Sequence, residues 1–419
     1  MKKRIALFTI FCLLIGVVPT YATFSETNNE TGRETYTLTM KEAVDLTLKN
    51  SPDLQVTDVY VDFAERSMID VRDMRDDLRD GINATLQGAH QQIRALEMQK
   101  QAVENFEPDP ITKAAKIAGL EVARQGVVYS MGAIDLMEET RKNIKNLSER
   151  AEEGFDDAKR ARQDAEKKVA YGVEKLYLAM LILDDFIVLQ EDNIDLQREL
   201  TRIERLKYQN GLSTAVEVDK VAQKVLEEEQ RLQDLKNTRL LLTYQMNRNI
   251  GREWNAPLRL APVGFQPVKI SDVEKAYQNA VDSALVVFQL NRNLDNKRDD
   301  LRKAENNSAE LERIRLEIRK AKIDLQEEQF KMKKNLEDLN SKIIMVKKNL
   351  TECKQKYEIA KADYEHVQVA YQQKMGLKVQ VDGSKLLMDK AYNDYLKAVN
   401  DYYLAVREFQ LGEKGVFFE

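Results

Sequence analysis

Hydrophobic residues in the C-terminal part of the chain recur at alternating spacings of three and four positions. The members of this first stripe are Leu336, Leu339, Ile343, Val346, Leu350, Cys353, Tyr357, Ala360, Tyr364, Val367 and Tyr371. Such a stripe spans about five heptads and is the a/d pattern of an α-helical coiled coil. After Met375-Gly376 a second stripe runs from Met388 to Phe409. Two stripes joined by a short break predict an antiparallel helical hairpin.

The register of this hairpin follows from counting outward from the break. Large residues then meet large residues in layers that are divided by alanines. The predicted pairs are Tyr364 with Tyr395, Ala360 with Ala398, and Tyr357 with Tyr402. A register displaced by one heptad fits the same pattern, so that alternative stays open.

The same arrangement occurs earlier in the chain. A helical stripe over residues 174–210 ends at Asn210-Gly211, and a second stripe runs from Val218 to Met246. Aligning the two breaks places Gly211 on Gly376, an offset of 165 positions. The segments that open each unit, 41–52 and 274–285, align at an offset of 233. The sequence therefore predicts two unequal copies of one helical-hairpin unit.

Composition supports an all-α fold. The 419 residues include only 16 glycines and 7 prolines, although strands need turns that use these residues. Charged residues make up 32% of the chain, and the net charge of -5 comes from interspersed signs. That pattern is typical of a solvated helix surface and does not indicate nucleic-acid binding.

The first 22 residues have the pattern of a secretory signal peptide. Lys2, Lys3 and Arg4 precede an apolar run over 5–18 and a small-x-Ala site at Thr20-Tyr21-Ala22. We expect export with cleavage; the alternative is a retained anchor, for which the run is short. Cleavage removes Cys12 and leaves Cys353 without a disulfide partner in the chain.

These patterns divide the chain into five parts. They are a signal peptide (1–22), a polar N-terminal linker (23–39), a first helical-hairpin repeat (40–250, with a helical insert at about 60–165), a connector (251–270) and a second helical-hairpin repeat (271–419). The connector is the one segment with extended character. Pro108 and Pro110 predict a turn within the insert, and Asn307-Ser308 predicts another in the second repeat.

With these features the chain resembles the TolC-type outer-membrane efflux protein family. The resemblance rests on the opening segment 38–54 (LTMKEAVDLTLKNSPDL), on two Gly-Leu tips that precede long helices, and on closing motifs that end at Gly251 and Gly412. It covers roughly residues 37–60 and 165–419. It implies a trimer whose helical hairpins form a tunnel and whose tips meet the adaptor (membrane-fusion-type) protein of an export pump.

The chain departs from this family between the head and the long helix of each repeat, where the family carries membrane strands. Residues 291–310 (NRNLDNKRDDLRKAENNSAE) are charged and show no alternation of apolar and polar positions. The insert holds one apolar run, Val127–Met137, within helical sequence. We therefore expect a TolC-like helical barrel subunit without the membrane β-barrel.

The resemblance places the candidate site residues at the two tips. The expected adaptor-contacting residues are Gly211, Leu212, Ser213, Gly376, Leu377 and Lys378, and the expected gate-lining residues are Glu217, Asp382 and Lys385. Lys385 stands where the family has a further acid, so a purely acidic ring is not expected. Both glycines also fit a simpler role as helix terminators with positive φ.

Little other chemistry is indicated. His90 and His366 are the only histidines and have no second ligand nearby, so we expect surface residues rather than metal ligands. Cys353 is expected to be a small buried apolar residue. With no phosphate loop and no Ser/His/Asp set, we expect no cofactor and no enzymatic activity.

Two functional hypotheses follow. The first is a component of an envelope export or efflux system, a homo-oligomer that docks an adaptor protein through its tips. The alternative is an exported coiled-coil scaffold or spacer of the cell envelope that forms no conduit. Both predict the same fold and a location in the cell envelope.

Overall fold

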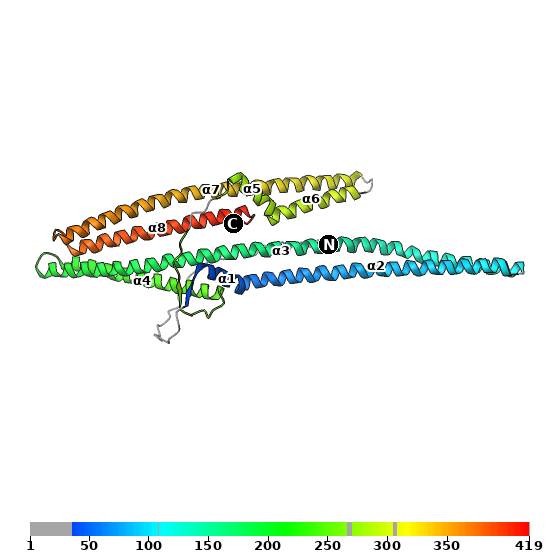
Figure 1. Ribbon diagram of the computed structural model, residues 1–419, viewed down its shortest axis with the longest axis horizontal. Coiled ribbons are helices and arrows are strands. Elements are labelled where there is room, and N and C mark those ends of the chain that lie inside the picture. The colour runs from blue at the N-terminus through cyan, green and yellow to red at the C-terminus, as the bar shows by residue number, and fades with distance from the viewer. Residues whose placement is uncertain (1–35, 108, 266–269, 305–307, 419) are drawn as a thin grey trace.

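The computed structural model describes residues 36–107, 109–265, 270–304 and 308–418, and it consists almost wholly of long helices laid along one axis (Figure 1). The elements are β1 (Tyr36–Leu38), α1 (Met40–Asn50), α2 (Pro52–Phe106), α3 (Pro110–Gln209), α4 (Ala215–Asn249), β2 (Leu258–Leu260), α5 (Val273–Ser283), α6 (Leu285–Lys303), α7 (Ser308–Gln372) and α8 (Lys378–Glu413). The all-α prediction is confirmed. The expected signal peptide lies outside the described residues.

Local sequence signals set the helix starts. At α1 the Thr39 hydroxyl accepts the Glu42 N–H at 3.3 Å, and the Glu42 carboxylate accepts the Thr39 N–H at 3.0 Å. This capping box satisfies donors that the first turn leaves unpaired. Pro110 opens α3, where its missing N–H costs nothing, and the Asp109 carboxylate caps the Thr112 N–H at 2.9 Å. The predicted turn between α2 and α3 is therefore confirmed.

The two repeats begin alike. Helices α1 and α5 have the same length, and their bounds differ by the 233 positions of the sequence alignment. Each is followed by a one-residue break, at Ser51 and at Ala284, whose N–H still bonds back into the short helix. The residues on the buried face also correspond, since Ala43 and Ala276 are both fully buried. The predicted repeat of the heads is confirmed.

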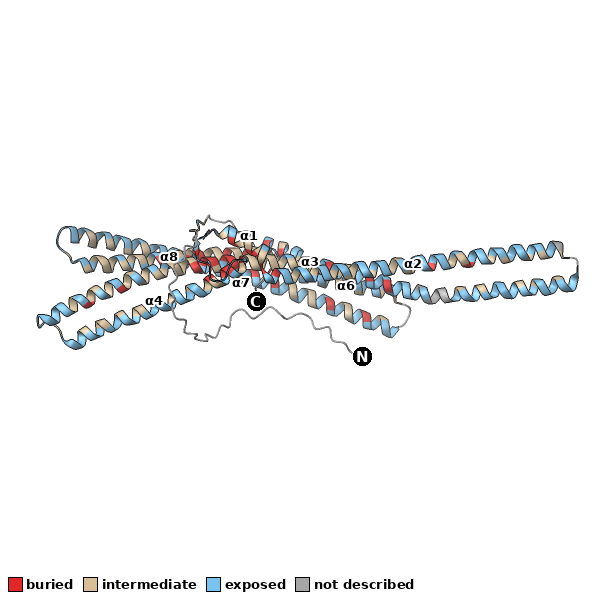
Figure 2. Cartoon of the chain, turned by 90° about the horizontal axis from the view of Figure 1, so that it is seen from below, coloured by how far each residue is buried: buried red, intermediate tan, exposed pale blue. Residues whose placement is uncertain are grey.

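The apolar core lies at the middle of the long axis, where the short helices meet the long ones (Figure 2). The first repeat contributes one cluster of buried residues: Leu38, Ala43, Val173, Tyr177, Met180, Met246, Ile250 and Leu258. The second repeat contributes another: Ala276, Ala280, Ala284, Val287, Met332, Leu336, Ile343, Ala405, Val406 and Phe409. The core is thus a belt, and the helices extend from it in both directions.

A small sheet closes the first cluster. Strand β1 pairs in parallel with β2, and Tyr36 lies opposite Leu258. The buried Tyr177 hydroxyl lies 2.8 Å from the Leu38 carbonyl oxygen and 2.7 Å from that of Ala261. The extended character expected of the connector is confirmed at β2. Strand β1 falls in the segment 23–39 that was expected to be a polar linker, so the described end of that segment is extended and paired.

The predicted seam of α7 is confirmed, but its register is not. Leu336 and Ile343 are at most 2% exposed, and the seam positions that follow are half-buried up to Val367. Tyr357 stacks on Tyr395, with ring centroids 6.2 Å apart and planes within 6°. The predicted pairing of Tyr357 with Tyr402 is therefore wrong, and the register is displaced by one heptad. The reason is that α8 begins directly after the turn, so residues 378–387 belong to the hairpin and not to its break.

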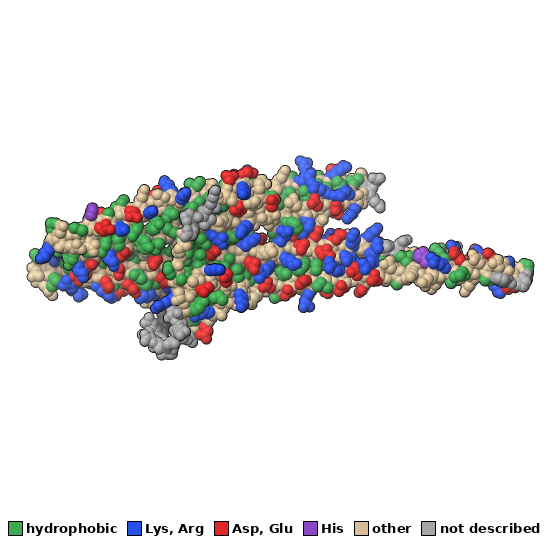
Figure 3. Space-filling view, viewed as in Figure 1, with side chains coloured by type: hydrophobic (Ala, Val, Ile, Leu, Met, Phe, Trp, Pro, Cys, Tyr) green, Lys and Arg blue, Asp and Glu red, His purple; other side chains and the backbone are tan. Residues whose placement is uncertain are grey.

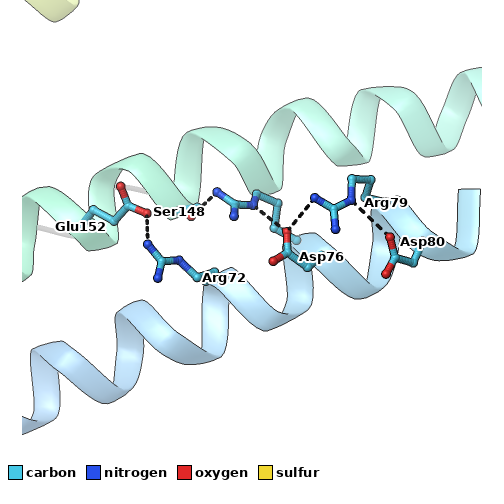
Figure 4. A network of polar contacts seen from close by, with 7 residues as sticks. Arg72, Asp76, Arg79, Asp80, Ser148 and Glu152 are labelled. Carbon is cyan, nitrogen blue, oxygen red and sulfur yellow. Dashed lines mark hydrogen bonds and ion pairs between the residues drawn. The ribbon is translucent and has the colours of Figure 1, made fainter. Parts of the chain in front are cut away.

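Away from the tips, α2 and the first half of α3 form a second antiparallel hairpin that reaches beyond α6 and α7 (Figure 1). With 100 residues, α3 is about 150 Å long. Many contacts along this arm are ionic: Arg72 binds Glu152 at 3.2 Å, and Arg75 contacts Asp76 and the Ser148 hydroxyl (Figure 4). Such exposed pairs add little stability each, so the arm depends on its narrow apolar seam.

The segment 291–310 is helical wherever it is described, because α6 continues to Lys303 and α7 begins at Ser308. Strands β1 and β2 are the only strands in the described part of the chain. Among the helices described, none contains an apolar stretch that would cross a lipid bilayer. In the view of Figure 3, charged side chains are dense where α6 and α7 lie alongside α2 and α3, whereas hydrophobic ones gather between that part and the tips.

Truncating a side chain at the centre of the belt should lower the free energy of unfolding strongly. Leu336 is fully buried against α8, so Leu336→Ala should lower the free energy of unfolding by about 2–5 kcal/mol through lost transfer energy and a residual cavity. Lys334→Ala, at an exposed position two residues away, should change it little. Urea unfolding followed by circular dichroism measures both. Equal losses at the two positions would contradict the assigned helix face.

Candidate functional site

The first tip joins α3 to α4 through a short turn that begins at Gly211. Gly211 has φ +74°, in the left-handed region that favours glycine. Its N–H bonds the Tyr208 carbonyl at 3.0 Å, and the Leu212 N–H bonds the Lys207 carbonyl at 2.8 Å. This pair of bonds is a Schellman motif, which satisfies the last carbonyls of the helix.

The second tip has the same hydrogen bonds at a different place in the sequence. The Lys374 N–H bonds the Tyr371 carbonyl, and the Met375 N–H bonds the Ala370 carbonyl, both at 2.9 Å. Lys374 has φ 60°, whereas Gly376 is not among the positive-φ residues of the described chain. The expectation that Gly376 takes positive φ is therefore wrong. Helix α7 ends at Gln372, and Lys374, two residues before the glycine, adopts the left-handed conformation.

The two tips therefore correspond at an offset of 163 positions. In structural terms Gly211 matches Lys374, Leu212 matches Met375, Ser213 matches Gly376, and Thr214 matches Leu377. The same offset relates buried residues of the belt, since Met180 matches Ile343 and Met246 matches Phe409. The sequence alignment of Gly211 with Gly376 differs from this geometry by two residues.

Large apolar side chains are exposed at both tips. Leu212 is 78% exposed, Met375 is 73% exposed and Leu377 is 65% exposed. Figure 1 shows both turns at the same end of the molecule. Isolated apolar side chains on a surface are ordinary, but here they recur at equivalent positions of two repeats. The arrangement suits contact with an apolar or amphipathic partner surface.

Polar groups hold each turn in place. At the first tip the Thr214 hydroxyl accepts the Glu217 N–H at 3.3 Å, and the Ser213 hydroxyl bonds the Glu204 carboxylate. The hydrogen bond from Ser213 holds the pKa of Glu204 below its usual range. At the second tip the Gln380 side-chain oxygen accepts the Leu377 N–H at 3.0 Å. Local hydrogen bonds therefore define both turns without burying the apolar groups.

The second tip also approaches the first hairpin. The pKa of Glu199 on α3 is lowered, first by the hydrogen bond from Arg202 and to a smaller extent by the charge of Lys378. Lys378 opens α8. The candidate residue Lys378 thus lies where the two hairpins of one chain come together.

The expected gate residues are spread over this end. Glu217 is exposed and pairs with Lys220 at 2.7 Å, while Asp382 is half-buried. By the structural offset, Glu217 lies level with Gln380 of the second tip. Lys385 binds Asp192 of α3 at 3.3 Å, and this hydrogen bond raises the lysine pKa. The cation thus already has an acidic partner within the chain.

The contact between the two hairpins contains a partly buried ion pair, Arg407–Glu174, which no sequence pattern indicated. The Arg407 guanidinium on α8 donates to both carboxylate oxygens of Glu174 on α3, at 2.9 and 3.0 Å. The Glu174 side chain is only 9% exposed, and its hydrogen bond raises the pKa of Arg407. Burial raises the pKa of the neighbouring Tyr403 to about 12. The one signal for this pair in the sequence is the position of Glu174, an acidic residue that directly follows the buried Val173 and precedes the buried Tyr177.

Other polar groups extend this contact. The Asn393 side-chain amide donates to the Asp185 backbone carbonyl at 3.1 Å. Together with Lys385–Asp192 and Arg407–Glu174, this bond joins α8 to α3 along the length shared by the two hairpins. The relative position of the two tips is therefore set by polar contacts from the belt to the turns.

The remaining candidates for chemistry are dispersed. His90 and His366 are both exposed, as expected, and Cys353 is half-buried rather than fully buried. Within the described ranges, His, Cys, Asp and Glu side chains form no group of three or more that could hold a metal ion.

The structure is similar to solved structures of outer-membrane channels, whereas the sequence matches no protein-family model and no curated protein sequence. A structure of CusC, described by its transmembrane channel formation, aligns with a TM-score of 0.52 at 9% identity over 91% of this chain and 96% of CusC. The outer-membrane channel OprN aligns with a TM-score of 0.54 at 12% identity over 90% of each chain. A membrane protein from Pseudomonas aeruginosa aligns with a TM-score of 0.52 at 9% identity, again over 90% of each.

These alignments cover about nine tenths of this chain and at least nine tenths of each compared chain. The chain therefore has the fold of TolC-type outer-membrane channel proteins, and the sequence resemblance is confirmed at the level of the fold. The similar structures are channel proteins and not enzymes.

Alanine at the two tip glycines should affect the free energy of unfolding differently. Gly211→Ala should lower the free energy of unfolding by about 1 kcal/mol, because a side chain is disfavoured at φ +74°. Gly376→Ala should cost nothing, since an added Cβ would meet its nearest atoms at an ordinary 3.5 Å. Thermal unfolding of the two variants compares them directly. A larger loss at Gly376 would show that this glycine, and not Lys374, forms the turn.

The ion pair between hairpins predicts a further effect. Arg407→Ala leaves the Glu174 carboxylate buried without its partner and should cost about 3 kcal/mol. Lys390→Ala, at an exposed position of the same helix, is the matched control and should be nearly neutral. If Arg407→Ala unfolds at the wild-type urea concentration, the pair does not join the hairpins in solution.

Proposed function

We propose that the protein is a TolC-like component of an envelope export or efflux system. In this proposal several copies assemble, and the tips dock an adaptor (membrane-fusion-type) protein of an export pump. The observation that supports it most directly is the pair of equivalent tips, which present Leu212 and Met375 to solvent at the same end of a channel-type fold. The proposed location is the cell envelope.

The exposed tip residues have no stabilising task within the chain. Leu212 and Met375 follow directly after the helix-terminating residues, and their side chains bury little surface. A tip contact of this kind joins apolar side chains of a hairpin end to a groove or a helical end of the partner. The neighbouring Ser213, Gly376, Leu377 and Lys378 would lie at the rim of the same contact.

The proposed gate lies just behind the tips. Glu217, Asp382 and Lys385 occupy the first turns of α4 and α8, so an assembly that gathers the tips around an axis would bring them together. Because Lys385 binds Asp192, the ring would carry paired charges. We therefore propose a polar and weakly selective constriction, which the exchange Lys385→Glu would make acidic.

A coiled-coil scaffold or spacer of the envelope is the second candidate. The observation that favours it is the α2–α3 arm, which extends well beyond the second repeat (Figure 1) and carries solvated ion pairs such as Lys100–Glu121. A spacer needs length and a solvated surface but no ordered tip contact. The two candidates therefore differ in what the tips do.

Substitutions at the tips test the proposal. We expect the variant with Leu212→Asp, Met375→Asp and Leu377→Asp to keep the wild-type melting temperature, because all three side chains are mostly exposed. The same variant should lose co-purification with an adaptor-type partner. Affinity purification from the native host, followed by mass spectrometry, measures the loss.

The matched control places charges elsewhere on the same helices. Val188→Asp and Ile359→Asp change side chains that are 59% and 64% exposed and lie away from the tips. This control should retain the adaptor. If the tip variant retains every partner of the wild type, the docking proposal is wrong and the scaffold is the better description.

A further inference from the structure

The far part of the α2–α3 arm is held together by a seam between its two helices. On α2 the residues that face α3 recur at spacings of four and three positions, and Ile82 and Ala89 among them are at most 9% exposed. On α3 the residues that face α2 include Ile117, Leu120 and Met131, which are half-buried. We call this contact the inner seam of the arm.

A second heptad pattern runs along α3, two positions before the inner-seam positions of that helix. Two residues turn the direction of a side chain by about 200° around a helix, so this pattern lies on the side of α3 away from α2. Val122 is 70% exposed and Tyr129 is 82% exposed. We call this pattern the α3 outer seam, and all its members are exposed: Ile111, Ala115, Ala118, Val122, Gln125, Tyr129 and Gly132.

Helix α2 carries its own second pattern, two positions after its inner-seam positions and again on the side away from its partner helix. Met98 is 64% exposed there. A Cβ at Gly81 or at Gly88 would meet no atom within 4 Å, so the surface beside these glycines is open. We call this pattern the α2 outer seam, and its members are mostly small: Gly81, Ala84, Gly88, Gln91, Ala95, Met98, Ala102 and Asn105.

Charged residues are missing from much of the arm that carries these two outer seams. Residues 81–93 of α2 and 125–134 of α3 contain no Asp, Glu, Lys or Arg, although such residues make up 32% of the chain. A helix face that stays in water is normally polar and charged, so this composition indicates that a partner covers it. The exposed amides of Asn83, Gln87 and Gln92 would be costly in hydrocarbon. The partner is therefore another protein surface and not the interior of a lipid bilayer.

An ion pair across the inner seam shows which parts of the two helices are level. Lys100 of α2 pairs with Glu121 of α3 at 2.8 Å. Counting onward from this pair places Val122 level with the space between Met98 and Ala102 of the α2 outer seam. Rotation about the long axis keeps each residue at its level, so the same match holds between neighbouring copies in a ring.

We propose that the α3 outer seam of one copy packs on the α2 outer seam of the next copy. In this arrangement the arms form a closed collar of helices beyond α6 and α7, at the end of the assembly opposite the tips (Figure 1). A second copy fits better than another partner, because every arm presents both halves of the contact on opposite sides and at the same level. This inference rests on the oligomer of the proposed function and adds a contact in which the second repeat takes no part.

The two outer seams are complementary in size. Tyr129 lies level with the space between Gln91 and Ala95, and its ring enters that space as a knob enters a hole in a coiled coil. Burial of the apolar groups supplies the association energy. Both seams cover about 35 Å of helix, so neither leaves a long unpaired end. Because α3 meets α2 and not α3, the contact is heterologous and forms a ring when the rotation between copies closes.

Disulfide cross-linking of the full chain tests this contact. In a background with Cys12→Ser and Cys353→Ser, one tagged copy carries Val122→Cys and a second, differently tagged copy carries Met98→Cys. On oxidation of the co-expressed and purified oligomer we expect a mixed dimer on a non-reducing gel. Its yield should be at least ten times that of a control pair.

The control pair combines Ala123→Cys with Met98→Cys. Ala123 is exposed and lies at almost the same height as Val122, but it belongs to neither seam. Each cysteine expressed alone should give no cross-link. A dimer formed by Val122→Cys alone, or equal yields from the two pairs, would overturn the proposed pairing.

Hydrogen exchange of the arm gives a second test. Val122→Asp with Tyr129→Asp places charges in the α3 outer seam and should raise the amide exchange rate of residues 81–132 in the oligomer at least tenfold. Ala123→Asp with Ser130→Asp places the same charges off both seams and should leave the rate near that of the wild type. All four positions are exposed in the single chain, so equal rates in the two variants would contradict the contact.

The outcomes separate this inference from the proposed function. A chain that sediments as an oligomer but gives no cross-link between Val122→Cys and Met98→Cys overturns the arm contact alone. A chain that sediments as a monomer overturns this inference together with the proposed assembly. Failure of the docking proposal appears elsewhere, as retention of the adaptor by the tip variant.

Discussion

The structure depends on one close contact within each repeat. The turn that follows the repeat's last helix lies against the end of its first short helix, α1 or α5. Gly251 and Gly415 end the last helices of the two repeats with φ of +76° and +75°. A Cβ at Gly251 would lie 2.9 Å from the Asn50 side chain, and one at Gly415 would lie 2.6 Å from the Ala284 backbone. Only glycine permits both the positive φ and this contact. The end of each repeat is thereby fixed to its beginning.

This constraint explains why the belt is the core and why the rest of the molecule is narrow. The short helices α1 and α5 meet the long helices only at the belt, where Tyr177 and Phe409 are fully buried. Beyond it each helix has a single seam against one or two neighbours. Local stability should therefore fall toward both ends, since it follows the density of buried contacts. The tips and the distal arm are the parts most available for contact with partners.

The contact between hairpins combines stability with orientation. In the ion pair Arg407–Glu174 the carboxylate is buried and the guanidinium is partly exposed; such a pair gains little net free energy after desolvation, yet it is costly to break because the carboxylate would lose its partner. The polar bonds of Asn393 and Lys385 continue this contact toward the tips.

The sequence by itself determined the helices, the two repeats and their heads. The three-four spacing identified the α7 seam through Leu336 and Ile343, and the offset of 233 aligned α1 with α5, because both depend on local periodicity. The family-like fold followed from the order and duplication of these segments. The exposed leucine Leu212 was also identified, because it follows an evident helix terminator.

Only the tertiary structure decided the register, the turn of the second tip and the contact between hairpins. A heptad pattern repeats every seven residues, so it cannot distinguish Tyr357 opposite Tyr395 from Tyr357 opposite Tyr402. Lys374, rather than Gly376, adopts positive φ because the carbonyls of Ala370 and Tyr371 must be satisfied within a short turn. Glu174 and Arg407 lie 233 residues apart, and no local pattern indicates that they meet. Long-range packing fixes each of these features, since periodicity along one helix carries no information about its partner.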